Sequence, residues 1–140
     1  MKNTFLSIVF LFISVVAFSQ DKAHINFDVK KHDFGKIYQD KDSVASVKFY
    51  FENTENVPLV ILNVTTTCGC TVSEWTKTPV EKNQKGFVNV IFNSKGISGE
   101  FSKSIYVKSN ADNDVVLLRI TGEVMNKKEK SIFNIFNIFK

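Results

Sequence analysis

The stretch from Val44 to Val64 reads VASVKFYFENTENVPLVILNV, and its pattern of apolar residues decides the fold class. Val47, Phe49 and Phe51 recur at every second position, and the run ends in the turn-forming segment 53–56. Val57-Pro58 then opens a second apolar run, which continues to Val64. An apolar period near two is typical of β-strands, whereas Asn, Gly and Pro mark turns. The stretch therefore predicts two strands joined by a loop.

Further segments of this kind follow one another from Ala23 to Met125. β-branched and aromatic residues fill them, and no stretch of this region carries the stripe of an amphipathic helix. About seven short strands at this spacing predict an all-β domain, with an immunoglobulin-like β-sandwich as its architecture. The expected strands cover residues 25–29, 36–38, 44–51, 59–64, 87–92, 101–107 and 115–120.

The chain divides into three parts: residues 1–19, 20–125 and 126–140. Lys2 precedes an apolar run from Phe5 to Phe18, and small residues stand just before Gln20, which is typical of a secretory signal peptide cleaved after Ser19. Residues 20–125 are enough for one domain with a core of its own. We therefore expect an exported protein of the periplasm, the cell envelope or the exterior, with a single sandwich domain at 20–125.

The formal net charge of +4 does not indicate a nucleic-acid-binding protein. Lys2 belongs to the expected signal peptide, and residues 126–140 hold four lysines against Glu129. Residues 20–125 are left with 13 basic and 13 acidic side chains, so they lack the excess of basic charge that neutralises phosphates. We expect a protein or a cell-envelope component as the partner, and no nucleic acid.

Several short motifs resemble one bacterial family, the domain of unknown function 1573. They are residues 32–37 (HDFGKI), 49–53 (FYFEN), Pro58-Leu59, 67–71 (TCGCT), Trp75, Pro79, Gly99 and 107–110 (VKSN). The resemblance covers about residues 24–124 and is most specific in Cys-Gly-Cys-Thr followed by Trp75, so Gly69 and Thr71 count as supporting residues of the cysteine motif. The chain departs from the family at residues 82–84, Lys-Asn-Gln in place of Pro-Gly-Glu. The resemblance implies an exported domain, akin to the immunoglobulin-like sandwiches of chaperone and cilium-associated proteins, without an assigned activity.

The pair Cys68 and Cys70 is the one place where the sequence offers distinctive chemistry. A disulfide here needs a local bend, which Gly69 permits, and its small ring stabilises the fold by only roughly 1.6 kcal/mol, against ~3 for a 15-residue loop. Four interpretations stay open: a strained disulfide that stiffens the turn before Trp75, a thiol-redox function, a soft-metal site such as copper(I), and two buried thiols without a role. Apart from copper, we expect no cofactor.

No catalytic constellation stands out, so we expect no enzymatic activity and no catalytic residue. The mature region has only two histidines, His24 and His32, both near its start, and its glycines occur singly. A zinc site would need both histidines with Cys68 and Cys70, whose spacing matches no zinc motif. We expect Trp75 to pack in the core or a turn, with an exposed binding role as the alternative.

The tail at residues 126–140 is basic at first and then rich in Ile and Phe. Taken as a helix, it places Ile132, Ile135, Phe136 and Phe139 on one face, which suits contact with a membrane surface or a partner groove. The alternative is that the tail packs on its own sandwich or stays frayed. Overall the sequence predicts an exported, non-enzymatic binding or assembly module of the bacterial cell envelope; the alternative is a thiol-redox or copper-handling protein acting through Cys68 and Cys70.

Overall fold

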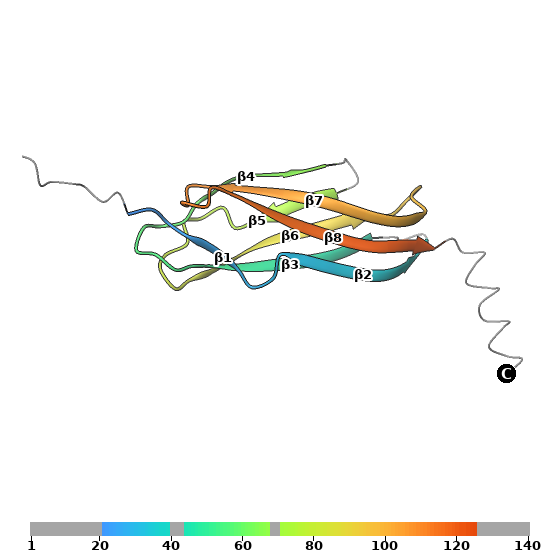
Figure 1. The fold of residues 1–140 in the computed structure, drawn as a ribbon, viewed down its shortest axis with the longest axis horizontal. Coiled ribbons are helices and arrows are strands. Elements are labelled where there is room, and N and C mark those ends of the chain that lie inside the picture. Colours follow the sequence, from blue (N-terminus) through green and yellow to red (C-terminus); the bar gives the residue numbers. More distant parts are fainter. Residues whose placement is uncertain (1–20, 40–43, 68–70, 126–140) are drawn as a thin grey trace, which may run out of the picture.

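The computed structural model describes residues 21–39, 44–67 and 71–125, and all of their regular structure is β. Its strands form two four-stranded sheets in the orders β1-β3-β6-β5 and β2-β8-β7-β4, and Figure 1 shows them running along the long axis of the molecule. The predicted all-β sandwich is confirmed, with eight strands rather than about seven. The strands are β1 (Ile25–Phe27), β2 (Lys31–Tyr38), β3 (Val44–Asn53), β4 (Ile61–Thr66), β5 (Thr71–Trp75), β6 (Lys85–Asn93), β7 (Gly99–Ser109) and β8 (Val115–Met125).

The N-terminal segment links the two sheets. β1 pairs antiparallel with β3, whereas β2 pairs parallel with β8 in the other sheet. Between them, the Asp28 N–H donates to Tyr50 O at 3.0 Å and the Arg119 N–H donates to Lys30 O at 2.9 Å. The same stretch of chain therefore supplies an edge strand to each sheet, β1 to one and β2 to the other.

The core lies between the sheets and is built from alternate residues of the long strands. Phe49 and Phe51 of β3 are fully buried, and Phe92 of β6 stacks on Phe101 of β7 with ring centroids 4.1 Å apart. This stack joins the two sheets directly. Full burial of each such side chain contributes about 1.5–3 kcal/mol, so these four Phe residues contribute substantially to the stability of the sandwich.

Two strands differ from the prediction. β5 was expected to be a turn, but residues 71–75 pair with β6 from Thr71↔Phe92 to Trp75↔Val88. β2 begins at Lys31 rather than Lys36, because an edge strand that is mostly exposed does not need the apolar alternation used to find it. His32 and Asp33, which lie outside the expected strand at 36–38, are thus part of β2.

Three predictions fall outside the described residues: the signal peptide at residues 1–19, Cys68-Gly69-Cys70, and the tail with Ile132, Ile135, Phe136 and Phe139. They remain predictions. In the described part of the chain, no helix has the length and apolar character needed to cross a membrane.

Candidate functional site

The outer face of the β2-β8-β7-β4 sheet carries an ordered set of side chains. In β8, Leu118 and Ile120 are fully buried while Leu117 is 42% exposed, so alternate residues point away from the core. The strand register aligns these outward residues into rows across the sheet. Starting at Glu123, two residues before the end of β8, the rows are Lys36, Glu123 and Glu100; Asp33, Thr121 and Ser102; Lys31, Arg119 and Ser104; Leu117, Tyr106 and Thr65; Val115, Lys108 and Asn63.

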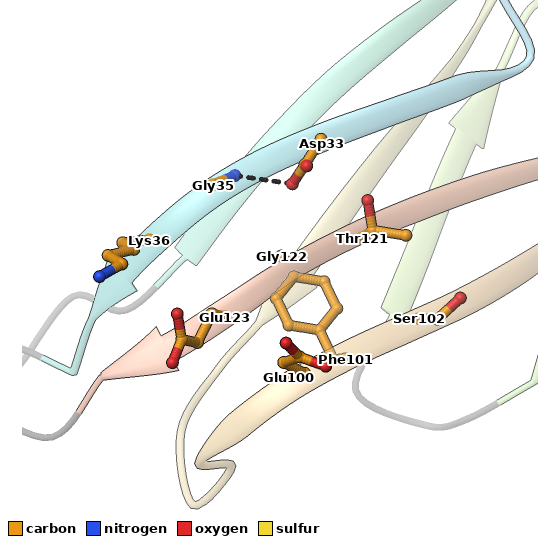
Figure 2. Close-up of a pocket in the computed structure, with 9 residues that line it drawn as sticks. All are labelled: Asp33, Gly35, Lys36, Glu100, Phe101, Ser102, Thr121, Gly122 and Glu123. Carbon is orange, nitrogen blue, oxygen red and sulfur yellow. Dashed lines mark hydrogen bonds between the residues drawn. The ribbon is translucent and has the colours of Figure 1, made fainter.

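The first two rows line a hollow of about 650 Å³, shown in Figure 2. Asp33, Glu100 and Glu123 contribute three carboxylates, against the one ammonium group of Lys36, which gives the lining a net charge of −2. The Thr121 hydroxyl oxygen is buried and has no hydrogen-bond partner among the described residues. We call this site the acidic hollow. No group of His, Cys, Asp and Glu side chains in the described ranges is arranged to hold a metal ion.

A bulge in β2 shapes the wall of the acidic hollow. Gly35 has a φ of 63°, and its N–H donates to Asp33 Oδ1 at 2.9 Å, the bond drawn in Figure 2. The register with β8 shifts between Asp33 and Lys36, so one extra residue is accommodated there. The bulge keeps both charged side chains on the outer face while Phe34 packs against the core.

Exposed apolar side chains gather further along the same face. Tyr106 and Leu117 are direct cross-strand partners that are 43% and 42% exposed, and Val115 is 50% exposed. We call these three residues the outer patch. Leu62, at the register shift of neighbouring β4, is also exposed. A group of exposed apolar residues on a sheet face is typical of a surface that meets a partner.

The residues on either side of the cysteine motif are anchored in different sheets. Thr67 N–H donates to Ser104 O at 3.2 Å beside β4, whereas Thr71 pairs with Phe92 in β6. Thr66 Oγ1 also donates to Thr71 O at 3.2 Å. Positions 68–70 therefore join the edge strand β4 of one sheet to the edge strand β5 of the other.

Trp75 ends β5 and is partly buried against the core. The Lys77 ammonium lies 3.1 Å from the centroid of its ring, a cation–π contact. The indole Nε1 is buried and finds no hydrogen-bond partner among the described residues. These contacts favour packing over an exposed binding role for Trp75.

Asparagine side chains fix the turns at the opposite end of the sandwich. Asn53 is fully buried; its Nδ2 donates to Val57 O at 2.8 Å and to Val80 O at 2.9 Å. Asn110 accepts the Val60 N–H at its Oδ1 and donates from Nδ2 to Pro58 O. These amides replace ladder hydrogen bonds where the strands end.

His24 and Asp112 are hydrogen-bonded at this end, with Nδ1 and Oδ1 2.7 Å apart. The hydrogen bond with His24, followed by the Asn113 N–H, lowers the pKa of Asp112 below its ordinary value. Asn113 adds two bonds to the backbone of Ile25, so the turn holds β1 in place. His32 lies elsewhere, in β2, with its ring against Phe34.

The family model for a protein of unknown function (DUF1573) matches residues 25–124. The chain belongs to the DUF1573 family. This confirms the resemblance found in the sequence, and the match ends at Val124, one residue before the end of β8. A search of curated proteins gave no match.

The geometry explains most of the DUF1573 motifs as scaffold. HDFG forms the β2 bulge, and Asn53 and Asn110 hold the turns. At the departure from the family pattern, Asn83 replaces glycine and has a φ of 60°. Asn tolerates this left-handed conformation better than most residues, so the turn geometry is kept.

Solved structures show the same fold in larger proteins. A protein of unknown function from Porphyromonas gingivalis W83 aligns with a TM-score of 0.64 and 11% identity, over 72% of this chain and 46% of that one. The Vibrio cholerae VesB protease aligns with a TM-score of 0.54 and 10% identity, over 74% of this chain and 32% of that one. This DUF1573 chain thus spans less than half of each of these proteins, and the likeness concerns the fold alone.

Sequence reasoning did not find the acidic hollow or the outer patch. Tyr106 and Leu117 look like core residues in the sequence because their neighbours Ile105 and Leu118 are apolar too. Their positions could have identified them, because they alternate with the buried residues along each strand and so face the opposite side of the sheet.

Proposed function

We propose that this DUF1573 chain is an exported, non-enzymatic binding or assembly module of the bacterial cell envelope. Its binding surface is the outer face of the β2-β8-β7-β4 sheet. The observation that carries the proposal is the outer patch, where Tyr106, Val115 and Leu117 are 42–50% exposed. With Leu62, this region holds four of the eight large apolar side chains exposed in the described residues. A protein partner that covers them gains apolar burial, and the neighbouring charged rows give the contact its orientation.

The test is capture of envelope proteins by the exported chain and by two substituted forms. Tyr106→Ser with Leu117→Ser removes most of the outer patch, whereas Tyr50→Ser removes a side chain that is 48% exposed on the other sheet. We expect the first form to lose the partner that the natural chain captures and the control to keep it. Equal capture by all three chains contradicts the proposal.

A second candidate function is thiol-redox or copper chemistry at Cys68 and Cys70. The observation that favours it is that both flanks of the motif are anchored, Thr67 to Ser104 and Thr71 to β6. One residue separates the two cysteines, and such close spacing suits reversible disulfide formation or a shared soft metal. Thiol titration and metal analysis test this candidate.

A further inference from the structure

The outer patch has the width of one α-helix. Leu117 in β8 and Tyr106 in β7 are neighbours, and exposed Thr65 of β4 completes their row. Neighbouring strands lie about 4.8 Å apart, so this row of three side chains spans about 10 Å, which is the diameter of a helix with its side chains. A single helix that lies along β8 therefore covers the patch.

The face of a sheet offers a partner side chains but no backbone groups, because the hydrogen bonds of the ladder run within the sheet. An extended segment laid flat on this face would bury its own N–H and C=O groups without partners. A helix pairs these groups internally, and a helix packed on a sheet is a common way to cover an apolar sheet face. The face therefore favours a helix as its occupant.

The outer patch lies between cations. Lys31 and Arg119 form the row on one side of Leu117. Lys108 lies beside Val115 in the row on the other side. All three cationic side chains are exposed, and none of them forms an ion pair within the described part of the chain. The three rows contain these cations and no carboxylate, so an occupant that carries carboxylates is complementary to them.

The acidic hollow limits where those carboxylates can lie. Asp33 is one row beyond Lys31, a distance of about 7 Å along the strands, and Glu123 is one row further. Carboxylates of the occupant are attracted at the basic row and repelled at the hollow, whose net charge is −2. The order of charges on this face therefore fixes the register of the helix along β8.

The same charges disfavour two other occupants. A second copy, related by a two-fold axis through the outer patch, would place Lys31 and Arg119 of one chain opposite Lys108 of the other. A flat anionic membrane that meets the patch would also approach the carboxylates of the acidic hollow on the same face. A helix avoids both conflicts, because its carboxylates can be confined to one turn or two.

We propose that the outer patch receives an acidic amphipathic helix of the partner protein. The apolar residues of this helix, at i, i+4 and i+7, pack on the patch, and carboxylates at i+8 and i+11 meet Lys31 and Arg119. A helix rises about 1.5 Å per residue, which places these carboxylates about 12–17 Å from residue i, and the strand from Val115 to Arg119 spans about 14 Å. This inference rests on the proposed function, for which it names the chemistry of the partner.

Titration of two synthetic peptides into the full mature chain tests the proposal, with fluorescence anisotropy as the measurement. The acidic peptide carries Leu at i, i+4 and i+7 and Glu at i+8 and i+11, with Ala and Gln elsewhere. The basic peptide has Lys in place of both Glu residues. At low salt, we expect the acidic peptide to bind saturably and at least about tenfold more tightly than the basic one, because two charge contacts change sign.

Charge reversal in the chain tests the assigned contact. Lys31→Glu with Arg119→Glu should exchange the preference, so that the basic peptide binds at least about fivefold more tightly than the acidic one. The matched control is Lys48→Glu with Lys85→Glu, which reverses two exposed lysines on the other sheet and should leave the preference unchanged. All four positions are exposed, so both forms should keep the fold.

Several results overturn the proposal. One is the absence of saturable binding of the acidic peptide up to about 1 mM, and another is equal binding of the two peptides. A preference that changes only in the Lys48 and Lys85 form also contradicts it. If Tyr106→Ser with Leu117→Ser breaks a dimer seen by sedimentation, a second copy is the occupant. If that form instead loses binding to vesicles of phosphatidylethanolamine and phosphatidylglycerol, the occupant is a lipid surface.

The capture of envelope proteins separates this inference from the proposed function. If capture depends on Tyr106 and Leu117 while reversal of Lys31 and Arg119 changes neither capture nor peptide preference, the proposed function stands and the acidic helix is wrong. If capture is equal in all chains while the two peptides behave as expected, the proposed function is wrong and the helix-binding face stands.

Discussion

The ring of Phe101 in β7 occupies the space where a Cβ of residue 122 in β8 would lie. Phe101 and Gly122 are direct cross-strand partners, and a Cβ at position 122 would meet Phe101 Cε1 at 2.8 Å and Gly35 O at 2.9 Å. The same arrangement occurs in the other sheet. Phe51 is the cross-strand partner of Gly86, and its ring lies against the position that a Cβ of residue 86 would take. In both sheets, an aromatic side chain fills the space that a glycine leaves open.

Gly122→Ala is expected to destabilise the sandwich. The added methyl group would push against a ring that is stacked on Phe92 and against backbone, neither of which yields easily. Overpacking of this kind costs about 1–3 kcal/mol, measured as the free energy of unfolding in urea. Ser102→Ala, at an exposed position of the same sheet, is the control and should change stability by less than about 0.5 kcal/mol. An unchanged unfolding midpoint for Gly122→Ala would contradict this prediction, because it would mean that the Phe101 ring moves aside without cost.

Asn53→Ala is expected to lower stability by about 2–4 kcal/mol. It removes the side-chain donor to the Val57 carbonyl and the acceptor of the Glu55 N–H, and it leaves the Val80 carbonyl with the Leu59 N–H alone, at a fully buried position. Asn56→Ala is the matched control, because its amide binds only an exposed lysine, Lys82, among the described residues. Equal losses for the two variants in urea unfolding would contradict the role assigned to Asn53.

Position 83 should prefer glycine. Asn83 has a φ of 60°, a conformation that costs side chains with a Cβ about 1–2 kcal/mol in general. We expect Asn83→Gly to keep or raise the thermal midpoint and Asn83→Ala to lower it. Should Ala and Gly give the same midpoint, the turn does not hold residue 83 in the left-handed region.

The pair of His24 and Asp112 should give the fold an acid-sensitive contact. The hydrogen bond with His24 lowers the pKa of Asp112 below the ordinary 3.8, so the folded state favours the ionised carboxylate. Such a group stabilises the fold fully above its unfolded pKa, and the contribution fades as pH falls through the lowered value. Asp112→Asn should therefore be less stable than the natural chain at pH 5 to 7, with the difference shrinking below about pH 4. An NMR titration that places the Asp112 pKa at or above its ordinary value would contradict this.

The parts of this fold that could be predicted from sequence are those where local pattern and burial agree. Phe49 and Phe51 alternate with outward residues, and the period of two locates β3 directly. β5 was not predicted as a strand because the Cys-Gly-Cys motif before Thr71 suggested a bend. Its strand character comes from pairing with β6. The same holds for Tyr106 and Leu117, whose exposure depends on which face each strand presents. Partner strands decide these features, and a single segment does not encode its partners.

The cysteine pair decides between the two candidate functions. If the chain is a binding module, we expect the exported protein to hold Cys68 and Cys70 as a disulfide that resists mild reductant, with no bound copper. Intact mass, thiol titration and metal analysis measure this directly. Replacing both residues by serine should then cost no more than roughly 1.6 kcal/mol, since the ring is so small, and should leave partner capture unchanged. Free thiols that bind copper(I), or a disulfide reduced as easily as those of exchange catalysts, would move the assignment to redox or metal chemistry, because a local constraint has no need of either property.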